Sequence, residues 1–219
     1  MSSFLSDVIL PAFATLFVII DPLGLTPFFV AMTMGADVAQ RRRIALRAVA
    51  LAAGVLLLFA FFGEAILKLF GISLPAFRIA GGLLLFMIAA EMLFEKRAER
   101  RRRAVTHTEP PHDYQAVDDV WVFPLGIPLI AGPGAITSVI LLMGQHSGDV
   151  MAEAAVIGVL LVVLGLTYAL FYMVSHAERF LSETAVSAIS RLLGIILAAL
   201  AVQFVLVGLK GAGLLATNS

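Results

Sequence analysis

The chain has 219 residues, of which 61 % are apolar and 14 % are charged, with no net formal charge and a mean hydropathy of +1.02. Soluble domains average roughly 45–50 % apolar and about 25 % charged residues, so the composition excludes a soluble domain and indicates a polytopic membrane protein. The absence of cysteine excludes disulfides, thiolate metal sites and cysteine nucleophiles.

Six apolar runs are long enough to cross a membrane. A hydrocarbon core of about 30 Å needs roughly 20 mostly apolar residues in a helix. The first run is not preceded by the basic segment of a signal peptide and has no cleavage site, so it is expected to remain as a span. The runs cover about 8–34, 44–70, 73–94, 121–144, 151–175 and 187–209, with interruptions at 21–24 and 131–134.

A polar, arginine-rich stretch at 95–120 divides the chain. It links a first group of three spans, residues 1–94, to a second group, residues 121–219. Its Arg100–Arg103 cluster is interpreted as a topology determinant that contacts anionic lipid, and not as a nucleic-acid patch. This cytoplasmic linker is therefore the expected boundary between two halves.

The basic residues indicate which side of the membrane each loop occupies. With six spans, the loops after spans 1, 3 and 5 share one side, which holds most of the basic residues. The positive-inside rule places these loops in the cytoplasm and both termini outside it. That side holds Arg41, Arg42, Arg43, Arg47, Lys96, Arg97, Arg100, Arg101, Arg102, Arg103, Arg179 and Arg191, and the other side holds Lys68, Arg78 and Lys210.

The two halves are weakly similar in sequence. Because each half has three spans, an odd number, the second copy must enter the membrane in the opposite direction. The sequence therefore predicts an all-α membrane protein of six transmembrane helices, built as two inverted three-helix repeats, with helices 1 and 4 broken at mid-membrane. The matched pairs are Pro22 with Pro133, Thr26 with Thr137, Gly24 with Ala135, Arg78 with Arg191 and Gly81 with Gly194.

The two interruptions, at 21–24 and 131–134, form the predicted site. In hydrocarbon, non-helical backbone is tolerated only where it is buried in protein or lines a wet cavity. Proline suits the first position of a helix, so each break is expected to start a new half-helix. Free N–H groups are expected from about Leu23 to Leu25 and from Gly134 to Ile136, backed by the positive end of a helix dipole. This arrangement favours an anion such as a substrate carboxylate.

The two breaks differ in charge, because Asp21 in the first corresponds to Gly132 in the second. An amino-acid zwitterion has one negative and one positive end. We therefore expect Gly132-Pro133-Gly134 to receive the carboxylate, while Asp21 faces the ammonium group or carries a coupled proton. The small residues around the breaks leave room for backbone-sized groups and hint at a small substrate; they are Gly24, Ala131, Gly132, Gly134 and Ala135.

Several of these side chains also have a structural interpretation. Asp21 before proline can be an ordinary helix N-cap, although an ionisable group at the centre of a span costs about 2.5–3.5 kcal/mol on insertion scales and needs compensation. Thr26 and Thr137 can donate their hydroxyls to a substrate or to their own helices. Arg78 and Arg191, in the first turns of spans 3 and 6, can form pairs at the interface or act in gating.

No motif indicates catalysis, a cofactor or a metal. The four histidines lie in a polar loop or at span ends, without the spacing of metal ligands. Walker A, dinucleotide-binding and nucleophile-elbow patterns are absent. Asp21 has no second aspartate at a comparable depth, and no histidine or lysine lies beside a serine in mid-span, so neither an acid dyad nor an activated serine is available.

The two breaks together resemble a known family. The first break has the motif Ile20-Asp-Pro-Leu-Gly24, followed by Pro27-Phe28. The second has Pro124-Leu-Gly-Ile-Pro128, followed by Ala131-Gly-Pro-Gly-Ala-Ile136. Together these motifs are similar to those of the MarC family of bacterial inner-membrane proteins, which includes SnatA-type small neutral amino acid transporters. The resemblance covers nearly the whole chain. It implies proton-coupled transport of glycine, alanine or similar substrates through a site that contains Asp21, Pro22, Gly24, Gly132, Pro133 and Gly134.

Three membrane functions fit these features. A secondary transporter of small neutral amino acids is the leading hypothesis. An exporter of another small metabolite and an ion channel are the alternatives, since broken half-helices also build pores. The expected partners are a small amino acid, a coupled proton and membrane lipid. The sequence leaves the direction of transport, the coupling ion and the oligomeric state open.

Overall fold

The computed structural model describes residues 4–94, 119–176 and 183–214, and every secondary-structure element in these ranges is helical. The linker expected at 95–120, with its Arg100–Arg103 cluster, therefore lies almost entirely outside the described residues. The elements are η1 (Leu5–Ile9), α2 (Leu10–Ile20), α3 (Pro22–Met32), α4 (Val38–Leu69), α5 (Leu74–Leu93), η2 (Asp119–Trp121), η3 (Val122–Ile130), α8 (Pro133–Gln145), α9 (Val150–His176) and α10 (Glu183–Gly211).

Polar caps set the start of three long helices. Asp37 Oδ1 accepts a hydrogen bond of 2.7 Å from the Gln40 N–H in the first turn of α4. Ser73 caps α5 and Asp149 caps α9 in the same way. Such caps satisfy N–H groups that have no partner inside the helix. The short polar segments between apolar runs therefore fix where each helix begins.

Five helical stretches in the described ranges are long and apolar enough to cross a membrane. The pair Trp121–Ile130 and Pro133–Gln145, bent by 51°, adds a sixth if it counts as one span. The six predicted apolar runs agree with these stretches to within a few residues at most ends. The inverted relation of the two halves and the depth of the breaks in a bilayer stay predictions. The five stretches are Leu5–Met32, Val38–Leu69, Leu74–Leu93, Val150–His176 and Ala185–Gly211.

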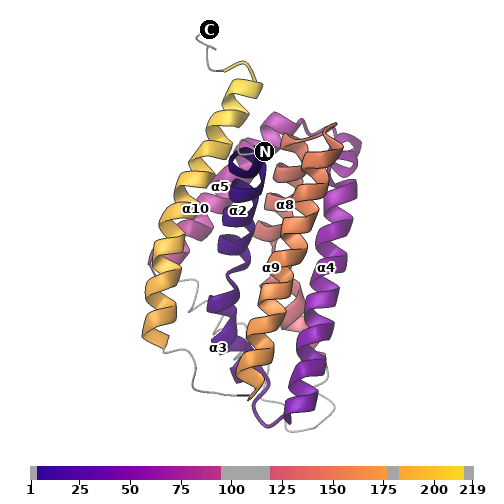
Figure 1. The fold of residues 1–219 in the computed structure, drawn as a ribbon. Helices are drawn as coiled ribbons and strands as arrows, with labels where there is room; N and C mark the ends of the chain where they lie inside the picture. The colour runs from indigo at the N-terminus through magenta and orange to yellow at the C-terminus, as the bar shows by residue number, and fades with distance from the viewer. Residues whose placement is uncertain (1–3, 95–118, 177–182, 215–219) are drawn as a thin grey trace.

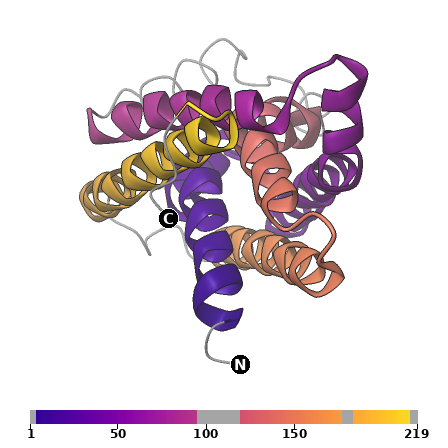
Figure 2. The same cartoon turned by 90° about the horizontal axis from the view of Figure 1, so that it is seen from above.

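The stretch formed by α2 and α3 runs through the middle of the bundle. Figures 1 and 2 show α5 and α10 on one side of it and α4, α8 and α9 on the other. In agreement, α2 packs against α8, α9 and α10, and α3 packs against α9 and α10. The connection between α2 and α3 is therefore enclosed by other helices.

The backbones of α5 and α10 touch along an antiparallel seam. A Cβ on Gly82 would lie 2.8 Å from the Ala201 carbonyl oxygen, and a Cβ on Gly208 would lie 2.9 Å from the Pro75 carbonyl oxygen. Only glycine allows so close an approach. Small residues are a common means of packing helices where no water is present to drive association.

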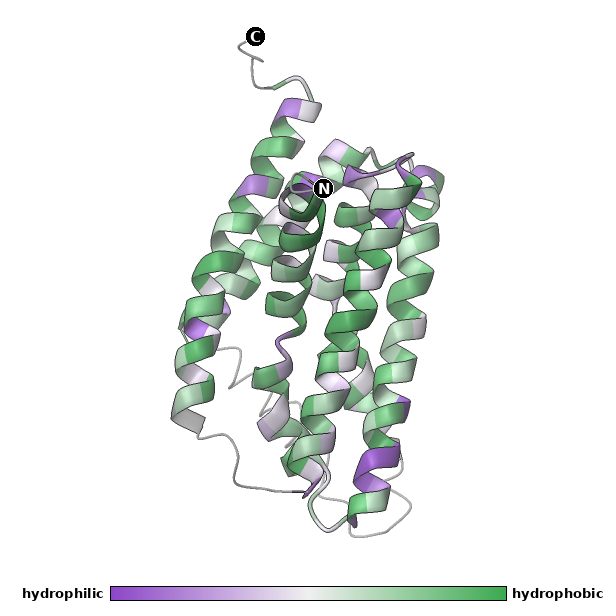
Figure 3. Cartoon of the chain, viewed as in Figure 1, coloured by the Kyte–Doolittle hydropathy of each residue, from purple (hydrophilic) through white to green (hydrophobic). Residues whose placement is uncertain are grey.

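The outer surface of the bundle is apolar. In Figure 3 the middle of the long helices is predominantly hydrophobic, and hydrophilic segments gather toward the ends. Inside, Phe29 of α3 and Phe171 of α9 stack with their ring centroids 4.4 Å apart. Such a surface suits contact with lipid rather than with water. Among the exposed side chains of α5 and α10 are Leu83, Phe86, Met87, Leu192 and Ile195.

Candidate functional site

The first break is a single residue, Asp21, between α2 and α3. Its backbone is left-handed, with φ 55° and ψ 63°, a conformation that costs most residues about 1–2 kcal/mol but is visited by aspartate. Because Pro22 follows, the right-handed helical conformation is also disfavoured at Asp21. Each helix beside the break has 11 residues. Asp21 therefore lies about 16 Å from the far end of either helix, at 1.5 Å per residue.

The Asp21 side chain caps the helix that follows it. Its Oδ1 accepts a hydrogen bond of 3.1 Å from the Gly24 N–H, and its carbonyl oxygen accepts one of 3.0 Å from the Leu25 N–H. A Cβ on residue 24 would overlap the carboxylate, so this cap requires glycine. The prediction of free N–H groups from Leu23 to Leu25 is therefore wrong for Gly24 and Leu25. The carboxylate of the break already occupies the place expected for an anion.

The Asp21 carboxylate is buried and reaches α10. Only 2 % of the residue is exposed, and the connection that contains it is a hydrophilic segment within an apolar bundle (Figure 3). The Oγ of Ser190 lies 3.5 Å from Asp21 Oδ1, longer than the usual distance of about 2.7–2.8 Å. Sequence reasoning did not include Ser190 in the site. No pattern near Ser190 in the sequence indicates this contact.

The second break lies at residues 131–132, where the path bends by 51°. In the segment before it, the two residues that precede prolines are extended, as proline requires. α8 then begins at Pro133. The Ile136 N–H donates a hydrogen bond of 3.0 Å to the Gly132 carbonyl oxygen, so the prediction that this N–H is free is wrong.

Unlike α3, α8 begins without a side-chain cap. Gly132 has no side-chain oxygen that could accept hydrogen bonds from the N–H groups of Gly134 and Ala135. No carboxylate at this position therefore neutralises the positive end of the α8 dipole. Gly132 is half-buried and Pro133 is exposed. The second break is thus an uncapped helix start, and its binding of a substrate carboxylate stays a prediction.

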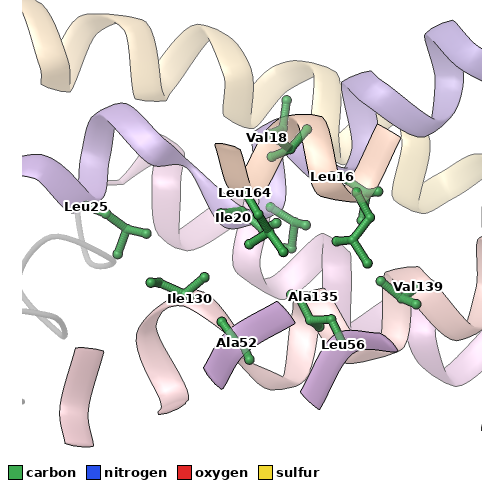
Figure 4. Close-up of a cluster of buried hydrophobic side chains, with 14 of the residues drawn as sticks. Leu16, Val18, Ile20, Leu25, Ala52, Leu56, Ile130, Ala135, Val139 and Leu164 are labelled. Carbon is green, nitrogen blue, oxygen red and sulfur yellow. The ribbon is translucent and has the colours of Figure 1, made fainter. Parts of the chain in front are cut away.

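The two breaks meet through apolar side chains. A Cβ on Gly134 would lie 2.8 Å from Ile19 Cδ1, two residues before Asp21. The structure therefore brings the two predicted segments together, but the contact between them is made by apolar side chains. Among the buried side chains at this contact, Figure 4 labels Ile20, Leu25, Ile130 and Ala135.

The two predicted threonines lie inside the bundle. Thr26 Oγ1 donates a hydrogen bond of 3.0 Å to the Pro22 carbonyl oxygen, one turn earlier in the same helix. Of the two alternatives for Thr26, the structure shows the bond to its own helix. Thr137 is buried, and its methyl group packs against Gly81 of α5.

The two predicted arginines differ in their surroundings. Arg78 Nη2 donates a hydrogen bond of 2.9 Å to the Gly144 carbonyl oxygen, in the last turn of α8. A helix C-terminus favours a cation, so this bond joins α5 to α8 in a structural role. Arg191 is exposed on α10, and its role in gating stays a prediction.

Neither break has the ligands of a metal site. Within residues 4–94, 119–176 and 183–214, no group of three or more histidine, aspartate or glutamate side chains is placed to hold a metal ion. The partners of Asp21 include a backbone N–H and a hydroxyl. An ammonium partner or a coupled proton for Asp21 stays a prediction.

A helical bundle with five or six membrane-length helices and an apolar surface defines an integral multi-pass membrane protein. Residues 6–213 match the MarC family integral membrane proteins, and the chain belongs to this family. The family predicted from the two break motifs is thereby confirmed.

Relatives in bacteria and archaea match along nearly their whole length. UPF0056 membrane protein MJ1677 of Methanocaldococcus jannaschii is 36 % identical over 92 % of this chain and 95 % of its own. UPF0056 membrane protein YvbG of Bacillus subtilis is 38 % identical over 93 % and 94 %, and UPF0056 membrane protein YhcE of Escherichia coli is 34 % identical over 91 % and 90 %. No solved structure matches the chain.

Proposed function

We propose that this protein is a secondary-active transporter of small neutral amino acids, such as glycine and alanine, coupled to protons. One observation carries the proposal: Asp21 is buried at 2 % exposure, halfway along an apolar stretch of membrane length. An ionisable group inside a membrane is costly and usually lies on a substrate or proton pathway. The proposed setting is the inner membrane of a bacterial cell.

Each end of the substrate has a proposed partner. The carboxylate of Asp21 faces the ammonium group or carries the coupled proton, and the uncapped start of α8, at Gly132, Gly134 and Ala135, binds the substrate carboxylate. The residues around both breaks are small, which limits the substrate side chain. Because Ile19 and Gly134 are in contact, the proposed site is closed in this conformation. Binding therefore requires α2 and α8 to separate.

The packing of the helices supports an inverted repeat of the two halves. α4 packs on its counterpart α9, and α5 packs on its counterpart α10. α9 contacts α2 and α3 of the first half, just as α4 contacts η3 and α8 of the second half. Two such halves can rock against each other around a central site, which is how many secondary transporters alternate their access.

The orientation follows from the basic residues. Arg41, Arg42, Arg43 and Arg47 lie in the first turns of α4, at the end of the bundle opposite to the start of α2. The positive-inside rule assigns that end to the cytoplasm and both termini to the other side.

Uptake by reconstituted protein tests this function. Proteoliposomes with an imposed pH gradient should accumulate labelled glycine or alanine, and Asp21→Asn should reduce that uptake at least about tenfold, since a neutral side chain cannot carry the proton. Asparagine is as good an N-cap as aspartate, so the fold is expected to persist.

Asp37→Asn is the matched control. Asp37 caps α4 as Asp21 caps α3, but it lies exposed at a helix end, so its substitution should leave uptake unchanged. Uptake that is equal in all three proteins would remove Asp21 from the mechanism. Absence of glycine and alanine uptake by the wild-type protein would reject the proposed substrate class.

A further inference from the structure

We propose that Arg41 closes the substrate pathway at one end of the bundle, and that a pocket beside Glu64 is the open mouth at the other end. The inference rests on the proposed transport function and adds the residue that gates it. Both residues belong to α4. At 1.5 Å per residue they are about 35 Å apart, close to the thickness of a membrane core.

The mouth is a pocket of about 110 Å³ between α4, α8 and the start of α9. Glu64 and Glu153 line it with Ser147, whose Oγ donates a hydrogen bond of 3.1 Å to Glu64 Oε2. A single water needs about 10–15 Å³ of such cavity volume, so the pocket has room for several waters or a small solute. Its lining includes Ile140 of α8, about 9 Å along the helix from Gly134 at the second break.

Arg41 fills the corresponding place at the opposite end. The residue is only 7 % exposed, and its Nε donates a hydrogen bond of 3.2 Å to the carbonyl oxygen of Thr33, which ends α3 and is itself fully buried. Next to it, the Arg42 guanidinium lies 4.7 Å from the centre of the Tyr172 ring on α9. Arg41 thus holds the end of α3 against α4 where α9 also approaches.

The internal repeat makes the two ends comparable. In both halves, a guanidinium N–H binds a carbonyl oxygen near the end of the second half-helix, but the arginines come from different helices, α4 at one end and α5 at the other. When the two halves are aligned so that Pro22 matches Pro133, Thr33 matches Gly144. When they are aligned so that the cap Asp37 matches the cap Asp149, Arg41 matches Glu153.

Arginine and glutamate at equivalent positions have opposite capabilities. A guanidinium donates hydrogen bonds, whereas an ionised carboxylate only accepts them. An ionised Glu153 therefore cannot donate a hydrogen bond to the Gly144 carbonyl oxygen, as Arg41 does to the Thr33 carbonyl oxygen. A pocket remains beside Glu153, whereas the Arg41 side chain fills the equivalent place at the other end of the bundle. The bond of Arg41 is buried and charge-assisted, so its loss should shift the balance between closed and open forms of that end by about tenfold or more.

Cysteine labelling tests the gate, because the natural chain has no cysteine. Ser147→Cys places one thiol at the pocket. Ser175→Cys places another in the last turn of α9, at the same end of the bundle as Arg41, where the serine is 4 % exposed. Each variant is purified in full length, placed in lipid nanodiscs and treated with a hydrophilic maleimide without substrate. Adding Arg41→Ala should raise the labelling rate of Ser175→Cys about tenfold and lower that of Ser147→Cys.

Arg43→Ala is the matched control, since it removes a nearby charge of the same basic run from an exposed position, and it should change either rate by less than about twofold. The proposal is overturned if Arg41→Ala changes neither rate, if it raises both as local unfolding would, or if Arg43→Ala has the same effect. Because no substrate is used, a failed gate and a failed substrate assignment are separate results: opposite shifts in labelling would stand even if glycine and alanine were not transported.

Discussion

The two breaks in this bundle start from similar sequences and end in different chemistry. At the first break, Asp21 turns its own carboxylate onto the next helix and binds the Gly24 N–H. At the second, Gly132 leaves the start of α8 without a side-chain cap. One break therefore carries its own anion, whereas the start of the helix at the other has no side-chain anion of its own. In the proposed transporter, the acid and the uncapped helix start would be complementary to the two ends of a zwitterion.

Glycine is required at both breaks, but for different reasons. Residue 132 lies so close to backbone that a Cβ would be 2.6 Å from the Pro128 carbonyl oxygen. At residue 24, the Cβ would collide with a side chain, the Asp21 carboxylate. A backbone carbonyl group can move less than a side chain can to relieve such a contact. Substitutions at these two positions should therefore separate the two breaks.

Gly132→Ala should have the largest effect, a loss of at least about 2 kcal/mol in the free energy of unfolding, because the carbonyl of Pro128 cannot rotate away. Thermal unfolding of the purified protein in detergent measures the change. Gly54→Ala is the control, since nothing lies within 4 Å of its Cβ, and it should be neutral or stabilising. Equal unfolding temperatures for the two variants would contradict the tight contact at the second break.

Gly24→Ala should cost about 1–2 kcal/mol, because the carboxylate can rotate away from the new methyl group but then gives up the cap. The double variant with Asp21→Gly should be less destabilised than the sum of the single variants, since glycine accepts the left-handed backbone and removes the collision. Strictly additive unfolding free energies would show that the carboxylate does not occupy the position described.

Ser190→Ala should have the smallest effect, below about 0.5 kcal/mol in stability, because its hydroxyl lies at the long limit of a hydrogen bond to Asp21. Ser175→Ala, which removes a hydroxyl with a bond of 2.7 Å to its own helix, is the comparison. A loss of several kcal/mol in the free energy of unfolding of Ser190→Ala would mean that α10 holds the first break in place through this hydroxyl. The contact with α10 would then be a further difference between the two breaks.

Local sequence patterns were sufficient to place the helices and the two breaks. Apolar runs of membrane length gave the spans, and the conformational restriction imposed by proline gave the helix starts at Pro22 and Pro133. These properties belong to neighbouring residues in the chain, so one sequence contains them.

Contacts between distant residues could not be predicted in the same way. Nothing near Ser190 in the chain indicates that its hydroxyl meets Asp21, and Arg41 looks like one member of a basic run until its bond to Thr33 is seen. The capping geometry of Asp21 was one of two open alternatives, because the rotamer of a side chain depends on its packed surroundings. The apolar contact of Ile19 with Gly134 likewise depends on how α2 and α8 pack.

The glycine seam between α5 and α10 joins the last helix of one half to the last helix of the other. Main-chain proximity along this seam therefore contributes to the cohesion of the molecule across its midline.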